Sequence, residues 1–93
     1  MAPLLNESEI QERVQVLNGW SVESKTLCAT RKFKDFIQAI DFVNKLVAPA
    51  ESAGHHPDIE ISYNTVKITL TTHDAGGLTQ KDFDLAQVIS QII

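Results

Sequence analysis

The sequence predicts an α+β fold in the order α-β-β-α-β-β-α, with a four-stranded antiparallel sheet and helices packed on one of its faces. Two pairs of segments alternate apolar and polar residues, as half-buried strands do, and a short turn joins each pair. Three other segments repeat their apolar residues every three or four positions, as helices do. The chain has 93 residues, so we expect residues 1–93 to form a single domain.

The first helix is predicted over Ser8–Asn18, with Asn6 or Ser8 as its N-cap and Gly19 as its stop. Its apolar residues fall on one helix face: Ile10, Val14 and Leu17. A hairpin follows, with a turn near residues 23–25. The buried parity of its strands holds Trp20, Val22, Leu27, Ala29 and Phe33, with Arg31 as the exception.

The second predicted helix begins after Asp35, a good N-cap. Its apolar residues keep a period of 3.6 residues: Phe36, Ile37, Ala39, Ile40, Val43, Leu46 and Val47. Pro49 falls inside any continuation of this helix toward Gly54. Because proline lacks an N–H and would crowd the carbonyl of Lys45, we expect a kink or a break there.

The second hairpin is predicted to turn at Asn64. One parity of its strands is apolar and should face the helices: Ile59, Ile61, Tyr63, Val66, Ile68 and Leu70. The other parity is polar, and we expect His73 to end the fourth strand. Residues 74–77 have the composition of a turn. The last helix should begin near Thr79 and carry Phe83, Ala86, Ile89 and Ile93.

Composition and charge narrow the classes of partner. The net charge of −4 argues against nucleic-acid binding, because phosphate neutralisation needs clustered Lys and Arg. No apolar run approaches the roughly 18 residues of a membrane span, and the N-terminus lacks a signal-peptide pattern. We therefore expect no membrane partner and a cytoplasmic location, with the nucleus left open. The single cysteine, Cys28, is interpreted as a core or sheet residue. The exposed edges of so small a sheet favour pairing with further copies of the chain, in a homodimer or homotetramer.

Three histidines are the candidates for chemistry. His55 and His56 lie between the long helix and the third strand, and Pro57 keeps the residue before it extended. Neighbouring side chains in an extended chain point to opposite sides, so His55 and His56 should take different roles. The start of the third strand and the end of the fourth are neighbours in an antiparallel hairpin. His73 is therefore expected to meet the other two at one end of the sheet.

Imidazoles in one cleft suit acid–base chemistry, because histidine exchanges a proton near neutral pH. An alternative of similar weight, on spacing alone, is a set of satisfied polar residues at a helix–strand junction. A zinc site that includes Glu51 or Asp82 is a weaker alternative, because adjacent histidines do not readily converge on one ion. Locally, Glu51 is interpreted as a solvated acid at a helix end, and Asp82 as the third residue of a capping box that starts at Thr79. Either acid could instead orient a histidine.

One spaced set of residues is specific: Glu51, His55-His56-Pro57, Tyr63, His73 and Asp82. This set resembles the signature of the pterin-4a-carbinolamine dehydratases. The stretch from Tyr63 to His73 and the Gly77-Leu78-Thr79 after it are also similar to that family. The resemblance covers nearly the whole chain, including the order of elements and the Gly19-Trp20 pair that leads into the first strand.

The resemblance implies a hydro-lyase that converts a 4a-hydroxytetrahydropterin to a quinonoid dihydropterin and water, and so recycles the pterin of aromatic amino acid hydroxylases. It implies no metal and no organic cofactor, because positioned imidazoles can move the protons. It places the pterin against seven residues: His55, His56, Pro57, Thr72, His73, Asp74 and Ala75. We expect His56 and His73 to transfer the protons, and His55 to be a pterin ligand or a second acid. Glu51 and Asp82 are expected to support them.

Two residues depart from the family pattern. Ile59 stands where some relatives carry an aromatic residue near the pocket, and Pro49 could shift the nearby Glu51 carboxylate.

The alternative function is a non-catalytic dimerisation or transcription-coactivator module of the same fold. A pterin-related role outside hydroxylase recycling, for example near molybdenum-cofactor metabolism, is a third option.

Overall fold

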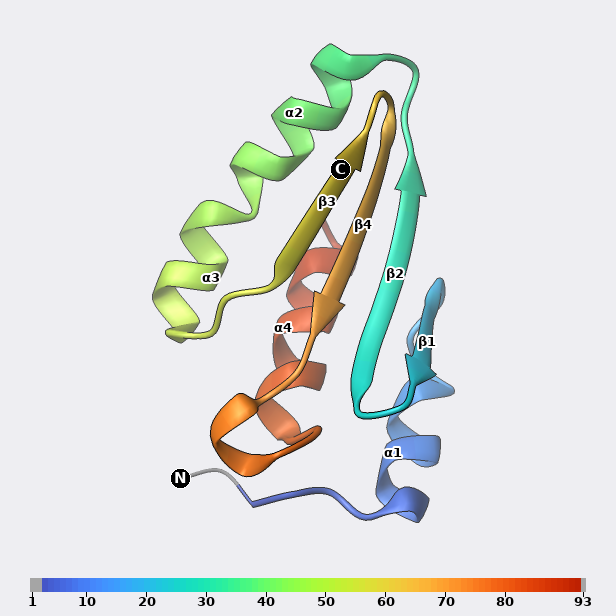
Figure 1. The fold of residues 1–93 in the computed structure, drawn as a ribbon, viewed down its shortest axis with the longest axis vertical. Coiled ribbons are helices and arrows are strands. Elements are labelled where there is room, and N and C mark those ends of the chain that lie inside the picture. Colours follow the sequence, from blue (N-terminus) through green and yellow to red (C-terminus); the bar gives the residue numbers. More distant parts are fainter. Residues whose placement is uncertain (1–2, 93) are drawn as a thin grey trace.

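The computed structural model describes residues 3–92, and within them the predicted α+β class is confirmed (Figure 1). The elements are α1 (Glu7–Val14), β1 (Trp20–Glu23), β2 (Thr26–Lys32), α2 (Phe36–Lys45), α3 (Val47–Ala53), β3 (Asp58–Ser62), β4 (Thr65–Leu70), the 3₁₀ turn η1 (His73–Ala75) and α4 (Gln80–Ser90). The strands form one antiparallel sheet in the order β1-β2-β4-β3. Among the described residues, no helix is long and apolar enough to cross a membrane.

One face of the sheet is apolar and carries the core. The register places Leu27 of β2 opposite Leu70 of β4, and both are fully buried. They belong to one buried cluster with Phe42 of α2 and with side chains of α4, which lies behind the sheet in Figure 1. Removing these apolar side chains from water is the main stabilising term. The opposite face is polar, with Glu60 and Lys67 paired across β3 and β4.

The first helix is shorter than the predicted Ser8–Asn18. It begins after Asn6, one of the two predicted N-caps. The Asn6 side chain accepts a hydrogen bond from the Glu9 N–H at 2.8 Å, and the Glu9 carboxylate accepts one from the Asn6 N–H at 2.9 Å. This reciprocal capping box fixes where the helix starts. The helix ends at Val14 because the Leu17 N–H donates to the Val14 carbonyl, a tighter 3₁₀-type bond that closes the last turn.

The fourth strand is also shorter than predicted. β4 ends at Leu70, so the prediction that His73 ends this strand is wrong. The chain instead folds back on itself: the Thr72 N–H donates to the Gly77 carbonyl at 3.0 Å, and His73 begins the 3₁₀ turn between them. Gly76 adopts a φ of +79°, which glycine reaches without strain. The loop that carries His73 is therefore closed at its base.

The predicted break at Pro49 is present. α2 starts after Asp35, whose carboxylate accepts a hydrogen bond from the Gln38 N–H at 2.9 Å. It ends at Lys45, the residue whose carbonyl the proline ring would crowd, and α3 begins two residues later. Pro49 is thus in the first turn of α3, where an N–H would have no helical partner. After α3 the chain leads directly into β3 (Figure 1).

Arg31 is the exception in the buried parity of β2, and its contacts explain it. Its guanidinium donates to the carbonyls of Ile92 at 2.7 Å and Ser90 at 3.2 Å, at the end of α4. A cation there satisfies carbonyls that have no helical partner. The guanidinium also lies 4.9 Å from the centre of the Phe42 ring. Ile93, which was predicted to belong to the last helix, lies outside the described residues.

Candidate active site

A polar hollow of about 260 Å³ opens at one end of the sheet. It is lined by Gly54, His55, His56, Thr71, Thr72, His73, Asp74 and Lys81. These residues come from the α3–β3 connection, the loop after β4 and the first turn of α4. The three histidines therefore meet in space, as the pairing of the second hairpin predicted. Because His73 is in η1, it reaches the hollow from a loop and not from the strand itself.

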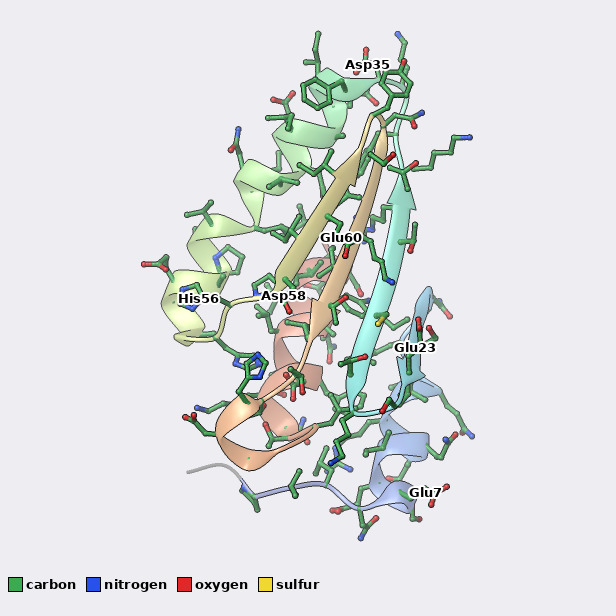
Figure 2. The ribbon with its side chains drawn as sticks, viewed as in Figure 1. Glu7, Glu23, Asp35, His56, Asp58 and Glu60 are labelled. Atoms are coloured by element: carbon green, nitrogen blue, oxygen red, sulfur yellow. The ribbon has the colours of Figure 1, made fainter. Side chains whose placement is uncertain are left out.

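The end of α3 separates the two adjacent histidines. Gly54 ends the helix in the left-handed conformation, with a φ of +61°. The His55 N–H then donates to the Ala50 carbonyl at 3.1 Å, which holds the first histidine against the helix end. His55 is directed to Asp82 of α4, whereas His56 is directed back to Glu51 of α3. Figure 2 shows His56 beside the end of α3, where the chain leads into β3.

The pair of His55 and Asp82 is buried. The Nε2 atom of His55 lies 2.5 Å from Oδ1 of Asp82, and the two side chains are 11% and 0% exposed. The other carboxylate oxygen, Oδ2, accepts hydrogen bonds from the Thr79 N–H at 2.9 Å and from the Thr72 hydroxyl at 2.8 Å. Asp82 is thus both the capping-box residue of α4 and the partner of a histidine, so the two interpretations of this acid hold together.

The pair of His56 and Glu51 is exposed. The Nε2 atom of His56 lies 2.5 Å from Oε2 of Glu51, and the side chains are 61% and 69% exposed. Water and salt screen such a pair, so it contributes little to stability. His56 also borders a second, apolar groove of about 250 Å³, which is lined by Val43, Leu46, Val47, Ala50, Glu51, His56, Pro57 and Ile59. His56 therefore stands between a polar and an apolar hollow.

His73 is exposed, and its imidazole has no hydrogen-bond partner among residues 3–92. Next to it in the wall of the hollow are Asp74 and Lys81, one acid and one cation. Lys81 is a wall residue that the sequence analysis did not identify. Its position in the first turn of α4, one residue before Asp82, is the only signal that could have pointed to it.

Two predicted pterin contacts are not in the wall of this hollow. Pro57 lines the adjoining apolar groove, and Ala75 lines neither. Thr72 does line the hollow, but its residue is only 8% exposed and its hydroxyl is directed to Asp82. Within the described part of the chain, no group of three or more His, Cys, Asp or Glu side chains is arranged to hold a metal ion.

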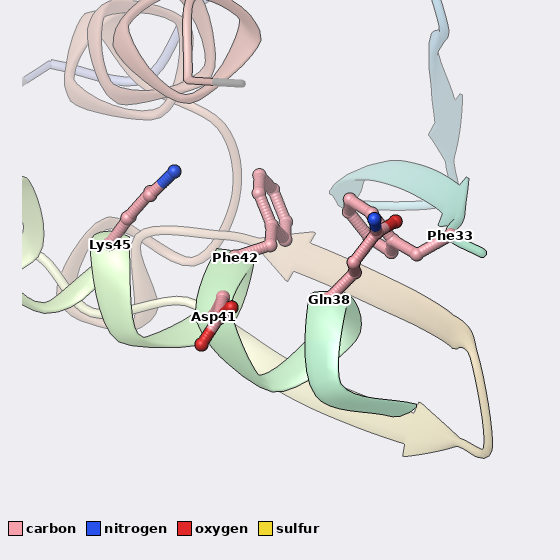
Figure 3. A pocket seen from close by; sticks show the side chains of 5 residues that line it. All are labelled: Phe33, Gln38, Asp41, Phe42 and Lys45. Atoms are coloured by element: carbon pink, nitrogen blue, oxygen red, sulfur yellow. The ribbon is translucent and has the colours of Figure 1, made fainter. Parts of the chain in front are cut away.

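A further hollow of about 320 Å³ lies along α2 (Figure 3). It is lined by Phe33, Gln38, Asp41, Phe42 and Lys45. The two aromatic rings are 5.0 Å apart between centroids and belong to the packing of α2 on the sheet. None of the imidazoles lines it, so we place the candidate active site at the histidines.

Comparison with known proteins shows the family to which the chain belongs. The sequence profile of the family described as pterin 4 alpha carbinolamine dehydratase matches residues 3–92. A protein of Nostoc punctiforme, provisionally named a pterin-4-alpha-carbinolamine dehydratase, is 75% identical over 99% of both chains. A protein of Roseiflexus castenholzii with the same provisional name is 50% identical over the full length of both chains.

Solved structures share the fold. A protein of Brucella melitensis described as a transcriptional coactivator/pterin dehydratase superposes with a TM-score of 0.87 at 36% identity, over 91% of this chain and 93% of that one. A pterin dehydratase-like protein described as a RuBisCO assembly factor in the alpha-carboxysome has a TM-score of 0.61 at 24% identity, which shows likeness of fold alone. The profile match and the identities show that this chain belongs to the pterin-4a-carbinolamine dehydratase family.

Proposed function

We propose that this protein catalyses the dehydration of a 4a-hydroxytetrahydropterin to a quinonoid dihydropterin, by acid–base catalysis with His55, His56 and His73. The observation that carries the proposal is the gathering of three imidazoles around one polar hollow, two of which are each hydrogen-bonded to a carboxylate of their own: His55 to Asp82 and His56 to Glu51. Membership of the dehydratase family supports this reaction over other proton transfers. The product would return to the pterin cycle of aromatic amino acid hydroxylases.

The reaction needs two proton movements and no change in oxidation state. The C4a–O bond breaks, the oxygen leaves as water after it gains a proton, and the pterin ring gives up one proton as the new double bond forms. We assign these transfers to His56 and His73, because both are exposed and can exchange protons with solvent between turnovers. His55, which is held by Asp82, would be a pterin ligand or a second acid.

The hollow offers polar groups for the heteroatoms of a pterin, and the apolar groove beside His56 offers a surface for less polar parts of the substrate. We therefore keep the proposed binding set of His55, His56, Pro57, Thr72, His73, Asp74 and Ala75. Within it, Pro57 would act from the groove, and Thr72 would act through its backbone or through Asp82. Lys81 joins the set as a cation at the rim.

A direct assay tests the activity. The 4a-carbinolamine is generated in a rapid-mixing instrument, and formation of the quinonoid product is followed by absorbance with and without the protein. Acceleration over the spontaneous dehydration is expected at neutral pH. An exchange of His56 or His73 for Ala should slow turnover greatly while circular dichroism remains unchanged. A wild-type protein that does not accelerate the reaction contradicts the enzyme proposal, and two near-normal variants contradict the assigned roles.

An interaction module is the second candidate, and exposed apolar side chains favour it. Phe36, Ile37 and Val47 on α2 and α3 are 51%, 70% and 58% exposed, and Tyr63 after the edge strand β3 is 66% exposed. Neighbouring exposed apolar side chains such as Phe36 and Ile37 commonly mark an interface. We propose that a second copy of the chain covers them, in a homodimer or homotetramer. Multi-angle light scattering should give a mass above that of one chain, and Ile37→Asp should lower it. A monomeric wild-type protein would contradict the proposal that a second copy of the chain covers this surface.

A further inference from the structure

A closed set of buried polar groups lies beneath the histidine hollow. Thr79 and Asp82 are 0% exposed and Thr72 is 8% exposed. The Thr72 and Thr79 hydroxyl oxygens are 2.8 Å apart, and the Thr72 hydroxyl donates to Oδ2 of Asp82, also at 2.8 Å. No buried side-chain polar atom in the described part of the chain is left without a partner. The set is therefore fully satisfied, and its hydrogens can be assigned.

Counting hydrogens fixes the direction of each bond. A hydroxyl has one hydrogen to donate, and a carboxylate only accepts. The Thr72 hydrogen is used on Asp82, so the Thr79 hydroxyl must donate to Thr72. The Thr79 N–H donates to the same Oδ2 atom. One carboxylate oxygen therefore has two donors from the threonines, and Oδ1 is the atom presented to His55.

The state of His55 follows from this arrangement. Its Nε2 atom lies 2.5 Å from Oδ1, and an ionised carboxylate only accepts, so Nε2 is the donor of this hydrogen bond. The bond made by one ring nitrogen sets the role of the other. In its neutral form, His55 would then have a free lone pair on Nδ1, so this nitrogen could accept a hydrogen bond from a ligand in the hollow.

We propose that Thr72 and Thr79 are positioning residues that lock the Asp82 carboxylate and thereby fix the tautomer and the ring orientation of His55. The expected effect of these threonines on turnover rests on the proposed function. Their expected effect on the tautomer and orientation of His55 does not. Thr72 also bridges to Gly77 at the base of the loop that carries His73. One threonine thus ties together the two walls of the hollow.

Thr72→Val tests the proposal, because valine keeps the shape and removes the hydroxyl. Loss of a hydrogen bond to a charged group typically costs about 1.5–3 kcal/mol, which corresponds to a fall in kcat of roughly 10- to 150-fold. KM should change by less than about threefold, since the hydroxyl faces Asp82 and not the substrate. Thr72→Ser should restore most of kcat. Thr65→Val, at the start of β4, is the matched control, because its hydroxyl donates to Asn64 and the residue lies outside the histidine hollow.

A spectroscopic readout is independent of turnover. In the ¹⁵N-labelled protein without substrate, the His55 Nε2 proton should give a slowly exchanging low-field resonance, which His55→Gln assigns by its loss. Thr72→Val should shift or broaden this resonance, whereas Thr72→Ser and Thr65→Val should keep it. If Thr72→Val does not fold, Thr79→Val is used. It removes the neutral hydrogen bond to Thr72 and the cap that the Thr79 hydroxyl makes on the Asp82 N–H. The lost bond to Thr72 should lower kcat by about 2- to 12-fold, and the lost cap should lower the free energy of unfolding by about 1 kcal/mol.

The outcomes separate this inference from the proposed function. An unchanged resonance in the folded valine variant overturns the inference, and so does a rise in KM without a fall in kcat, which would make Thr72 a substrate contact. If the wild-type protein is inactive on the carbinolamine but the resonance is present and depends on the Thr72 hydroxyl, the dehydratase proposal fails and the positioning role of the threonines stands.

Discussion

The Asp82→Asn exchange isolates the buried partner of His55. The two side chains have nearly the same shape, so the site should keep its packing. The Thr79 N–H and the Thr72 hydroxyl both need an acceptor at the position of Oδ2, so the amide oxygen of the new Asn should take that place. The amide NH₂ then faces Nε2 of His55. Because an NH₂ group only donates, His55 would have to accept there and carry its proton on Nδ1.

The size of the effect follows from what is lost. The exchange removes a charge-assisted hydrogen bond in a site where the carboxylate is fully buried and the imidazole is 11% exposed. Such bonds contribute about 1.5–3 kcal/mol, which is roughly 10- to 150-fold in rate if the bond acts fully in the transition state. The same Asp-to-Asn exchange beside the histidine of a serine-protease triad costs about 10⁴-fold through the wrong tautomer. We expect a fall in kcat of at least tenfold for this exchange.

The assay is the rapid-mixing dehydration measurement, with circular dichroism to confirm the fold. Asp84→Asn is the matched control: it makes the same change two residues later on α4, where the acid is exposed, is bonded to Gln80 and lies outside the histidine hollow. The control should keep wild-type kcat. If Asp82→Asn also keeps more than half of the wild-type kcat while it folds normally, His55 takes no part in the chemistry through this carboxylate and the reasoning is refuted.

Three further outcomes are expected. His73→Gln should lower kcat by about 10²- to 10⁴-fold, and free imidazole should restore part of it because the position is exposed; no fall would remove His73 from the proton transfers. Glu51→Gln should lower kcat by no more than about fivefold, with less difference at high salt, because its pair with His56 is exposed; a loss of 100-fold would show that screening is unimportant there. Phe42→Ala should lower the free energy of unfolding in urea by about 3–5 kcal/mol, because the side chain is 2% exposed and packs against Phe33; a change below 1 kcal/mol would mean that this part of the core readily collapses.

Much of the fold could be predicted because its signals are local. The period of two in the strands, the caps at Asn6 and Asp35, and the break imposed by Pro49 each depend on residues close in sequence. The ends of α1 and β4 could not be predicted in the same way. They depend on bonds across a turn, from Leu17 to Val14 and from Thr72 to Gly77, that leave no periodic pattern.

The part of the candidate site that local backbone geometry positions could be predicted from the sequence. Pro57 and the end of α3 separate His55 from His56 through backbone geometry alone. The partner of His55 was not predictable from local sequence, because Asp82 is 27 residues away and already has a local explanation as a cap. The roles of Thr79 and Lys81 were hidden for the same reason: each looks like an ordinary residue of a helix start until the hollow is known.

The two adjacent histidines differ in exposure and in their carboxylate partners, and this difference predicts which role each takes in the dehydration. A turnover moves one proton to the leaving oxygen and one away from the ring, so each group must recover its starting state through solvent. His56, at 61% exposure and with an exposed acid beside it, can do so quickly. His55 is held by a buried carboxylate whose other oxygen is bound by two donors, so its ring is fixed and its Nε2 proton is retained. The structure therefore favours His56 for proton exchange and His55 for orientation. On this reasoning Asp82→Asn should lower kcat more than Glu51→Gln does, and the reverse order would contradict this division of roles.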